Sequence, residues 1–395
     1  MTNVVIASAV RTAIGDFQGA LASIPPCDLG ALVAAEAIAR AGIAADAVQQ
    51  TVFGNVIHTA PEDMYISRVA AMRAGVPETA PALTLNRLCG SGLQAVVTAA
   101  EQIMLGNAAI ALAGGAESMS RAGHLLSARV GQKMGDVRAV DMMTGALTDP
   151  FGRIHMGITA ENVAARHGID RAAQDAFALE SHRRAAAAIE AGHFRDQILP
   201  VTVRQGRKEI LFDRDEHVRP ALTLDDLAKL RPAFSKEGSV TAGNASGLND
   251  GAAALVLMDQ TAAGAAGVRP LARIVAYGLG GVAPDVMGLG PIPASRQALE
   301  RAGLGVQDLD VIESNEAFAA QACAVSAELG FDPARVNPNG GAVALGHPIG
   351  ASGAIILTKL IHELNRTGGR YGLATMCIGG GQGIAVIIEA LGHAA

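Results

Sequence analysis

The stretch from Ser91 to Gly115, SGLQAVVTAAEQIMLGNAAIALAGG, decides the fold, because a related stretch, SGAIILTKLIHELNRTGGRYGLATMCIGG, runs from Ser352 to Gly380. In both stretches a Ser-Gly pair opens a helical pattern, and a short apolar run with a Gly-Gly pair closes it. The separation is 261 residues between the two serines and 265 between the two final glycines. Such self-similarity predicts that one structural unit occurs twice in the chain.

Two landmarks further upstream keep nearly the same separation. The RAG triplet that ends at Gly42 returns 261 residues later at Gly303, and VFGN ending at Asn55 returns 260 residues later as IESN ending at Asn315. Short β-rich runs alternate with helical patterns of ~10 to 18 residues in each copy, which is typical of βαβ units. We therefore expect an α/β protein with a mostly parallel sheet, whose two copies pack as a pseudo-symmetric pair.

The separation is twice the length of one copy, so about 130 residues are inserted in the first copy. Residues 119–248 carry 18 basic and 16 acidic side chains, for a net charge of +2, while the rest of the chain carries 13 and 21, for a net charge of −8. We predict an inserted loop domain at residues 119–248 with one clear helix, which begins at the N-cap Asp170 and stops at Gly192. The two copies then occupy residues 1–118 with 249–268, and residues 269–395. A relatively basic insertion suits an anionic ligand, although an ordinary solvated face explains the same charges.

Composition and charge exclude several classes of protein. The chain has 395 residues, of which 50% are hydrophobic and 17% charged, and its net charge is −6. It has room for two or three domains but no basic stripe for a nucleic acid. The first residues do not show the cationic segment followed by an apolar segment that is typical of a signal peptide. No stretch reaches the ~18 charge-free apolar residues of a membrane span. The sequence predicts a soluble cytoplasmic protein without a nucleic-acid or membrane partner.

The four cysteines, Cys27, Cys89, Cys323 and Cys377, form no CxxC pair, which argues against a disulfide scaffold or a thioredoxin-type site. Cys89 lies in NRLCGSG, directly before a helical pattern, where free N–H groups and the helix dipole lower the pKa of a thiol. We interpret Cys89 as a nucleophile, with a small buried core thiol as the alternative. Cys27 and Cys323 have no glycine-rich surroundings, and we interpret them as structural.

The second copy supplies candidate partners for Cys89. His347, in GHPIGASG, also precedes a helical pattern, and if a pseudo-twofold axis relates the copies, it reaches Cys89 as an activating base. A satisfied core histidine is the alternative. Cys377 heads CIGGGQG, whose glycines leave backbone N–H groups open to an oxyanion. Asn315 and Glu316 end a strand and can hold a water or orient a partner, unless they form only a surface turn.

Other kinds of site are disfavoured. Pro348 beside His347 and the lack of a second close ligand argue against zinc, so no metal site is predicted. No GxGxxG follows the first strand, no GxxxxGK[ST] occurs for nucleotide phosphates, and no GxSxG elbow occurs for serine hydrolysis.

Longer motifs add a family resemblance that covers the whole chain. NRLCGSGLQA, GGAESMS, HMGITAEN, RPAF, TAGNASGLNDGAA, SNEAFAAQ, GHPIGASG and CIGGGQG resemble the thiolases, in particular the bacterial short-chain acetoacetyl-CoA and β-ketothiolase branch. The resemblance implies two βαβαβαββ halves in a five-layered α-β-α-β-α arrangement. It also implies an inserted loop domain that binds coenzyme A (CoA), and a homotetramer built as a dimer of dimers.

The activity implied by the resemblance is the reversible Claisen condensation of two acetyl-CoA to acetoacetyl-CoA and CoA, with thiolysis of short 3-ketoacyl-CoAs in reverse. It follows a ping-pong route through an acyl group on Cys89, with His347 as the activating base and Cys377 as the acid/base for the α-proton. By similarity, Asn315 holds a water that forms one oxyanion hole with His347. The N–H groups of Cys89 and Gly379 form the other. CoA and acetyl-CoA are substrates, and no permanently bound cofactor is implied.

The resemblance also places the coenzyme. Arg219 is expected at its adenosine end, with Ala233 and Phe234 beside it, and Ser246 at the pantetheine. The remaining residues that the resemblance places along the tunnel are Leu147, His155, Met156, Ala242, Leu248, Ala317 and Phe318.

Chain length and pathway are less well defined by the sequence. The resemblance implies that Met287 lines an acyl pocket that suits C4 to C6 substrates, serving polyhydroxyalkanoate precursor synthesis or short-chain degradation. A degradative 3-ketoacyl-CoA thiolase of β-oxidation that prefers longer chains is the first rival. A catalytically silent acyl-CoA or lipid carrier has no need of two placed thiols, and a decarboxylative ketoacyl synthase typically pairs one cysteine with two histidines.

Overall fold

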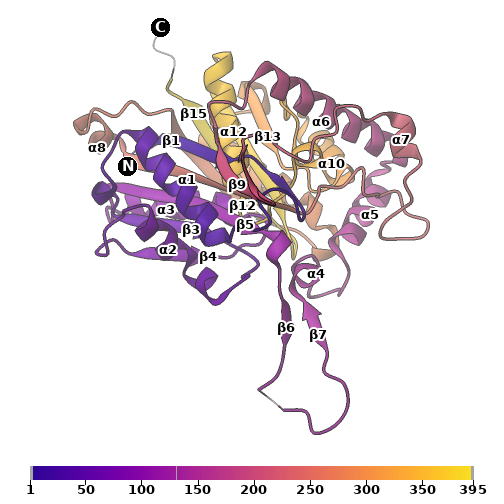
Figure 1. Cartoon of the computed structure of the whole chain (residues 1–395). Helices are drawn as coiled ribbons and strands as arrows, with labels where there is room; N and C mark the ends of the chain where they lie inside the picture. The colour runs from indigo at the N-terminus through magenta and orange to yellow at the C-terminus, as the bar shows by residue number, and fades with distance from the viewer. Residues whose placement is uncertain (1–2, 130, 393–395) are drawn as a thin grey trace.

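An 11-stranded sheet runs through the computed structural model, which describes residues 3–129 and 131–392 (Figure 1). Its strands are β1 (Val4–Thr12), β2 (Gly15–Asp16), β3 (Gln50–Gly54), β4 (Ala82–Leu85), β5 (Ile110–Ser118), β8 (Ile198–Leu199), β11 (Asn249–Asp259), β12 (Ala272–Gly281), β13 (Val311–Ser314), β14 (Tyr371–Ile378) and β15 (Gln382–Ala390). Across the sheet the order is β13-β14-β15-β12-β1-β11-β5-β3-β4, with β2 beside β11 and β8 beside β1.

This order contains the predicted duplication. Reading outward from the centre gives β1-β11-β5-β3 in one half and β12-β15-β14-β13 in the other, and the halves join where β1 pairs with β12 at Val5↔Arg273 and Ile6↔Ala272. The counterpart of β4 in the second half is reduced to a parallel bridge between Ile312 and Val336. The two βαβαβαββ halves are therefore confirmed, with one short strand missing from the second.

The expectation of a mostly parallel sheet is wrong. Among the strands of the described residues, only β3–β4, β3–β5, β13–β14 and the short β1–β8 pairing are parallel. The longer pairings, β1–β11, β5–β11, β12–β15 and β14–β15, are antiparallel. The reason is visible in β14 and β15, which a tight turn joins directly, and such a connection permits only antiparallel pairing.

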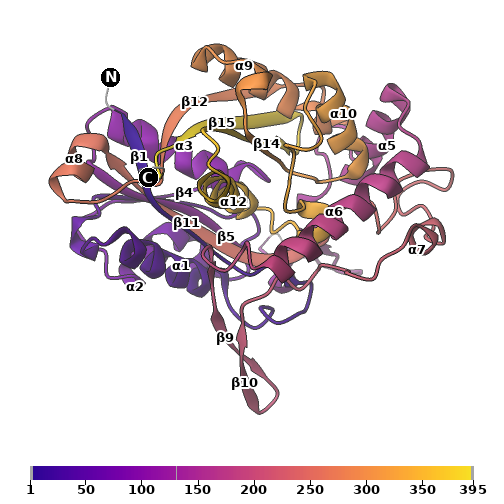
Figure 2. The same cartoon turned by 90° about the horizontal axis from the view of Figure 1, so that it is seen from above.

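Helices cover the strands in three layers. α1 (Pro26–Ala41) and α2 (Ile66–Arg73) cover the outer face of the first half, and α9 (Pro291–Ala302) and α10 (Ala319–Leu329) cover that of the second. Between the halves, α3 (Ser91–Met104) packs against α12 (Ser352–Thr367), which Figure 2 shows end-on at the centre of the molecule. This is the expected α-β-α-β-α arrangement, and it buries every residue of β1.

Two glycines allow the central helices to meet at their first turns. A Cβ at Gly92 would lie 2.7 Å from Ala354 N, and a Cβ at Gly353 would lie 2.3 Å from Leu93 N. Real Cβ atoms do not approach backbone so closely, so this crossing requires glycine at both positions. The helix N-termini of the two halves therefore converge, as the repeat predicted.

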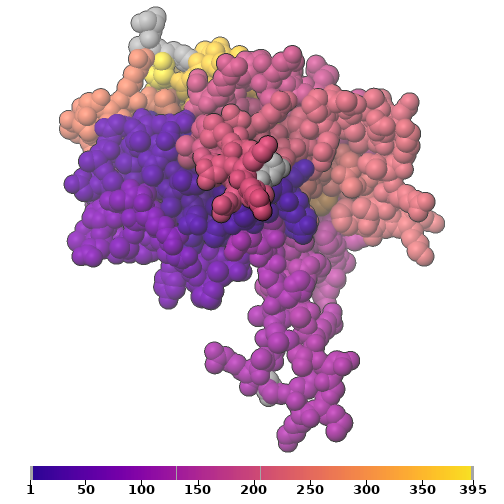
Figure 3. All heavy atoms as spheres, in the orientation of Figure 1, coloured from indigo at the N-terminus to yellow at the C-terminus, as the bar shows by residue number. Residues whose placement is uncertain are grey.

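Besides β8 and the short η3 (Met119–Arg121), the segment 119–248 contains eight helices and strands among its described residues. They are β6 (His124–Leu126), β7 (Ala139–Asp141), α4 (Met142–Ala146), α5 (Met156–His167), α6 (Arg171–Ala191), β9 (Val201–Gln205), β10 (Lys208–Phe212) and α7 (Leu224–Ala228). The β6–β7 hairpin projects far from the body (Figure 3), and β9–β10 forms a second projecting hairpin (Figure 2). The predicted helix is confirmed as α6, because the Asp170 side chain accepts from Ala173 N and Gly192 ends the helix in the left-handed conformation.

A buried ion pair fixes this segment to the central strand. The Arg11 guanidinium of β1 lies 2.7 and 2.9 Å from the two carboxylate oxygens of Asp215, and its Nε donates to Gln197 Oε1 at 2.8 Å. Asp215 also accepts from Ile14 N at 2.8 Å, and neither charged side chain is exposed. The segment is thus fixed to the body through a fully hydrogen-bonded charge pair.

The remaining helices complete the chain. They are α8 (Gln260–Ala265), α11 (Ala342–Leu345) and the short 3-10 helices η1 (Ala45–Ala47), η2 (Pro61–Tyr65), η3 (Met119–Arg121), η4 (Pro284–Leu289) and η5 (Val306–Asp308). Within residues 3–129 and 131–392, no helix is long and apolar enough to cross a membrane. The cytoplasmic location stays a prediction. So do the domain limits, whose outermost residues 1–2 and 393–395 lie outside the described part of the chain.

Candidate active site

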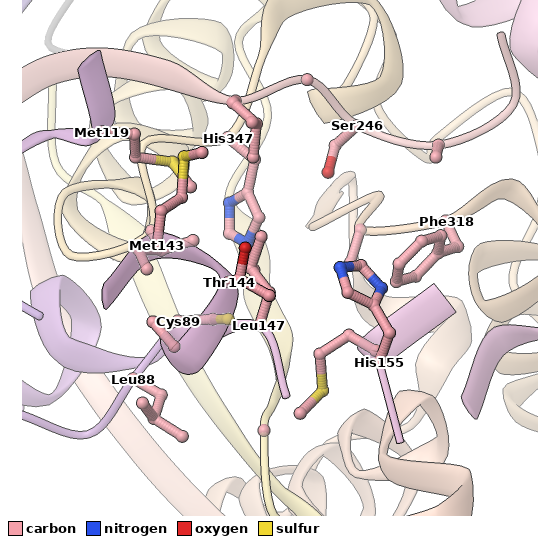
Figure 4. A pocket seen from close by; sticks show the side chains of 18 of the residues that line it. Leu88, Cys89, Met119, Met143, Thr144, Leu147, His155, Ser246, Phe318 and His347 are labelled. Atoms are coloured by element: carbon pink, nitrogen blue, oxygen red, sulfur yellow. The ribbon is translucent and has the colours of Figure 1, made fainter. Parts of the chain in front are cut away.

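A cavity of about 460 Å³ lies where loops of both halves meet the inserted segment (Figure 4). Most of its lining is apolar. The predicted site residues in that lining are Cys89, Leu147, His155, Met156, Ala233, Phe234, Ala242, Ser246, Leu248, Met287, Ala317, Phe318, His347 and Gly379. The structure therefore brings together residues that the sequence separates by up to 290 positions, from Cys89 to Gly379.

Cys89 is presented by a strained turn between β4 and α3. Leu88, directly before it, has a φ of +46°, which side chains rarely adopt. Ser91 holds this turn, because its hydroxyl accepts from Arg87 N at 2.8 Å and donates to Leu88 O at 2.7 Å. The thiol is thereby directed into the cavity rather than into the core, as Figure 4 shows.

The expectation that the start of the helix lowers the pKa of Cys89 is wrong, because the net shift of this pKa is upward. Burial, with a small contribution from the buried Glu117 carboxyl, raises the pKa of the Cys89 thiol to about 11. Backbone hydrogen bonds from Gly379 and from Cys89 itself act in the opposite direction, but they do not offset the burial. At neutral pH the sulfur is therefore protonated and needs a base to become a nucleophile.

His347 lines the same cavity as Cys89 and is held by two hydrogen bonds. Its backbone N–H donates to Asn249 Oδ1 at 2.9 Å, and its Nδ1 lies 2.7 Å from Ser352 Oγ. Burial lowers the pKa of His347 to about 4, so the ring is neutral at pH 7. The other ring nitrogen, Nε2, is buried and has no hydrogen-bond partner within the described parts of the chain. A neutral imidazole with one unengaged nitrogen is equipped to accept a proton.

Cys377 lies at the end of β14, next to the cavity rather than in its lining. It is fully buried, and it packs in one cluster with Met156, Met287 and Phe318, which do line the cavity. Burial raises the pKa of its thiol, and the neighbouring Cys89 raises it further. Cys377 therefore lies directly behind residues that line the same cavity as Cys89.

Asn315 follows β13, and its amide is set apart from the main cavity. Its backbone N–H donates to Thr375 O at 2.9 Å, while its buried Nδ2 has no hydrogen-bond partner among residues 3–129 and 131–392. Asn315 lines a second, small cavity of about 10 Å³ with Gly346 and Ser352, which flank His347. A polar cavity of ~10 to 15 Å³ accommodates one water.

Glu316 does not lie in a surface turn, so that alternative is wrong. Its buried carboxylate accepts from Ser181 Oγ at 2.7 Å, Asn337 Nδ2 at 2.8 Å and Val343 N at 3.1 Å. Because Ser181 belongs to α6, this carboxylate links the loop after β13 to the inserted segment.

One wall of the cavity is aromatic. The His155 ring stacks on Phe234 with 4.7 Å between ring centroids, and Phe318 meets Phe234 edge-on at 6.1 Å. His155 is the N-cap of α5, where its Nδ1 accepts from Gly157 N at 3.1 Å. A Cβ at Gly157 would lie 2.2 Å from the Phe234 ring, so glycine leaves room for this wall.

Arg219 is the one predicted coenzyme residue outside the cavity lining. Its guanidinium is exposed and lies 3.2 Å from Asp16 Oδ2, and its backbone N–H donates to His182 Nδ1 at 3.1 Å. His217, two residues earlier, does line the cavity and is hydrogen-bonded to Asp16. Arg219 therefore lies two residues from the cavity lining but not within it.

Sequence reasoning missed part of the wall. The cavity residues that it did not name are Leu88, Met119, Met143, Thr144, Ala146, His217, Ala245, Gly247 and Ile349. Met119 and Ile349 lie inside the motifs GGAESMS and GHPIGASG, so the sequence did mark their surroundings as part of the site. Met143 and Thr144 lie in the short α4, which follows the β6–β7 hairpin, and no local pattern marks them as site residues. Cys27 and Cys323 both lie outside the lining.

Two family models together match nearly the whole chain. Residues 4–261 match the Thiolase, N-terminal domain family, and residues 268–390 match the Thiolase, C-terminal domain family. The chain is 64% identical over 389 residues to the beta-ketothiolase BktB of Cupriavidus necator, covering 98% of each protein. It is 55% identical over 390 residues to an acetyl-CoA acetyltransferase of Shinella zoogloeoides, covering 98% of this chain and 99% of the relative.

A solved structure agrees as well. The crystal structure of human mitochondrial 3-ketoacyl-CoA thiolase in complex with CoA matches with a TM-score of 0.96 at 43% identity, covering 98% of both chains. Fold and relatives together are those of an acyltransferase. The chain belongs to the thiolase family, and the resemblance found in the sequence is confirmed.

Proposed function

We propose that this protein is an acetyl-CoA C-acetyltransferase that condenses two acetyl-CoA to acetoacetyl-CoA and CoA, and catalyses the reverse thiolysis. The observation that carries the proposal is the placement of the Cys89 thiol and the neutral His347 ring in one cavity. Two relatives that span its whole length are named a β-ketothiolase and an acetyl-CoA acetyltransferase.

The first half-reaction moves the acetyl group to Cys89. His347 Nε2 accepts the thiol proton while the sulfur attacks the thioester carbonyl of acetyl-CoA. The C–S bond to CoA then breaks, and the CoA thiolate takes the proton back from the imidazolium as it leaves. Sulfur suits this role because a thiolate is both a good nucleophile and a good leaving group in the next step.

The second half-reaction forms the carbon–carbon bond. The Cys377 thiol gives its proton to neutral His347, and the Cys377 thiolate removes a proton from the methyl group of a second acetyl-CoA. The resulting carbanion attacks the acyl carbon on Cys89. The bond from that carbon to Cys89 breaks, the leaving Cys89 sulfur takes the proton back from the His347 imidazolium, and acetoacetyl-CoA is released. Burial that raises the pKa of Cys377 also makes its thiolate a stronger base toward C–H.

Charge develops on two acyl oxygens along this route, and each needs donors. The N–H groups of Cys89 and Gly379, which already face the Cys89 sulfur, form one set. A water held by the unpartnered Nδ2 of Asn315, together with protonated His347 Nε2, forms the other. The first set lies in the cavity lining, whereas Asn315 lies outside it, so its water bridges from the Asn315 amide to His347.

The inserted segment, residues 119–248, binds the coenzyme. It supplies the aromatic wall of His155 and Phe234, together with Ser246, and its net charge of +2 suits an anionic ligand. Arg219 reaches the adenosine end from outside the cavity.

The acyl pocket favours short chains. Met287 is buried at the cavity wall, where its side chain limits the space available to an acyl group. C4 and slightly longer 3-ketoacyl-CoAs are the expected substrates. The test is to measure kcat/KM across C4 to C16 3-ketoacyl-CoAs, and activity that rises beyond C8 would replace this specificity with that of a degradative long-chain thiolase.

The homotetramer is proposed as well. The projecting β6–β7 hairpin exposes Leu125, Leu126, Met134 and Val137, and an apolar surface of this kind marks a contact with another protein chain. Light scattering after size-exclusion chromatography tests this, and a monomer across micromolar concentrations would contradict it.

Mass spectrometry after incubation with acetyl-CoA tests the central proposal. The acetyl adduct is expected on Cys89 alone, retained in Cys377→Ala and lost in Cys89→Ala. An unmodified Cys89, or an adduct on Cys27 or Cys323, overturns the mechanism.

A further inference from the structure

The serines that open α3 and α12 are equivalent residues of the two halves. Ser91 and Ser352 are 261 residues apart, and each is the first residue of its helix. Each hydroxyl donates to a carbonyl that precedes the helix: Ser91 Oγ lies 2.7 Å from Leu88 O, and Ser352 Oγ lies 2.9 Å from Pro348 O. Each hydroxyl therefore donates its single proton to a backbone carbonyl.

The two serines differ in what donates to them. In the first half, the Arg87 backbone N–H donates to Ser91 Oγ at 2.8 Å. The residue 261 positions after Arg87 is Pro348, which has no N–H to donate. The accepting side of the Ser352 hydroxyl is consequently left for another group, and His347 Nδ1 lies there at 2.7 Å.

The position of the protons follows from this network. With its own proton directed to Pro348 O, the Ser352 hydroxyl can only accept from His347, so Nδ1 carries a hydrogen. The opposite arrangement, with the hydroxyl donating to Nδ1, would leave Ser352 Oγ and Pro348 O 2.9 Å apart with no proton between them. A neutral imidazole has one N–H, so Nε2 is left with its lone pair.

We propose that Ser352 and Pro348 are positioning residues that hold neutral His347 as the Nδ1–H tautomer, so that the Nε2 lone pair faces the cavity and Cys89. The inference rests on the proposed role of His347 as the base for Cys89. When the thiol proton moves to Nε2, the Nδ1–H bond to Ser352 stays in place and stabilises the imidazolium. Nε2–H then becomes a donor to the acyl oxygen.

The duplication explains how this arrangement differs from its counterpart. In the first half, the serine stabilises the strained turn that presents the nucleophile. In the second half, Pro348 has no N–H to donate, so the hydroxyl of the equivalent Ser352 is free to accept a hydrogen bond from His347. One inherited hydroxyl therefore serves the nucleophile in one half and the base in the other.

Neutron crystallography of the perdeuterated full-length protein at neutral pH tests the tautomer without any substitution. The expected result is a deuteron on His347 Nδ1, none on Nε2, and the Ser352 deuteron directed toward Pro348 O. A deuteron on Nε2 with a bare Nδ1 overturns the proposal.

Single-turnover acetylation of Cys89 tests its consequence. Ser352→Ala removes the acceptor for Nδ1–H and should slow acetylation by about ten- to a hundred-fold, the usual effect of losing a partner that orients a histidine, with little change in KM. Pro348→Ala restores a backbone N–H that competes for the hydroxyl and should act in the same direction. The matched control is Thr358→Val. This variant also loses a buried hydroxyl that donates to a carbonyl four residues earlier in α12, but Thr358 has no hydrogen bond to His347.

The outcomes separate this inference from the proposed function. If Ser352→Ala acetylates Cys89 as fast as Thr358→Val, the positioning role is wrong even though the thiolase reaction stands. If the wild-type protein forms no adduct on Cys89, the proposed function fails, and the neutron result still decides the tautomer.

Discussion

At the scale of single residues, Cys89 and His347 form a pair that is neutral in the resting protein. The pKa of the thiol is raised to about 11 and that of the imidazole lowered to about 4, both by burial. A preformed thiolate–imidazolium pair, as in many cysteine enzymes, is therefore disfavoured here. The proton instead moves when the thioester arrives, which keeps the thiol unreactive toward other electrophiles.

The neutral pair predicts how alkylation depends on pH. Because only the thiolate reacts and its pKa lies near 11, alkylation of Cys89 by iodoacetamide should accelerate about tenfold per pH unit between pH 7 and pH 9. Mass spectrometry of the Cys89 peptide measures the rate. A rate that is already constant from pH 6 upward would show a stable thiolate and contradict the assignment.

Met287 gives a second prediction at this scale. Met287→Ala enlarges the acyl pocket and should raise the ratio of kcat/KM for C8 over C4 3-ketoacyl-CoA by at least about tenfold, since one methylene in a pocket is worth ~1 to 3 kcal/mol. The substitution should also cost about 2 to 5 kcal/mol of stability. Met258→Ala is the matched control, because Met258 is equally buried in β11 but does not line the cavity. An unchanged ratio removes Met287 from the acyl pocket.

The sequence identified the residues of the site better than their electrostatics. Cys89, His347 and Gly379 could be named because glycine-rich motifs surround them, and all three line one cavity. The sign of the Cys89 pKa shift could not be predicted, because it depends on how much protein surrounds the thiol, and that is set by the packing of both halves. Thr144 was missed for the same reason, since only tertiary packing brings it to the wall.

At the scale of elements, the crossing of α3 and α12 fixes the distance between the two catalytic loops. Cys89 lies two residues before the start of α3, and His347 lies five residues before the start of α12. The first turns touch through Gly92 and Gly353, so a displacement at this crossing moves both loops.

Substitution at the crossing should therefore affect folding and activity together. Gly92→Ala places a Cβ 2.7 Å from Ala354 N, where only backbone movement can relieve the clash, and should destabilise the protein by about 3 kcal/mol or more. Urea unfolding measures this. Gly264→Ala in α8 is the control, since nothing lies within 4 Å of its Cβ position, and alanine in a helix should stabilise by up to ~1 kcal/mol. Equal stability of the two variants would show that the helices are not held in contact.

Helix ends could be predicted from local sequence, whereas the direction of the strands could not. α6 was predicted to the residue because its caps, Asp170 and Gly192, are local signals. The direction of the strands was not, because β11 pairs with β5 only after the chain returns from an insertion of about 130 residues. Pairing at that separation depends on where the insertion leaves the chain, and no local pattern records it.

At the scale of the whole molecule, the inserted segment works only if it is held against the duplicated body. It supplies much of the cavity wall, and one buried charge pair, Arg11 with Asp215, fixes it to the central strand. Besides both ends of the guanidinium, Asp215 accepts a hydrogen bond from Ile14 N. The Arg11 guanidinium also lies over the Phe194 ring, 5.0 Å from its centroid.

Arg11→Met should loosen the segment while leaving the Cys89 turn intact. Removing the cation leaves the Asp215 carboxylate buried without its partner, which should cost about 3 to 5 kcal/mol. The exposed pair of Arg183 and Glu180 has the same N–O distance, 2.7 Å, as Arg11 and Asp215, yet Arg183→Ala should cost far less stability because solvent screens this pair. Thermal unfolding measures both costs, and limited proteolysis within residues 195–248 measures the loosening. If cleavage in Arg11→Met is no faster than in Arg183→Ala, the segment is held by its other contacts and the buried pair is not its anchor.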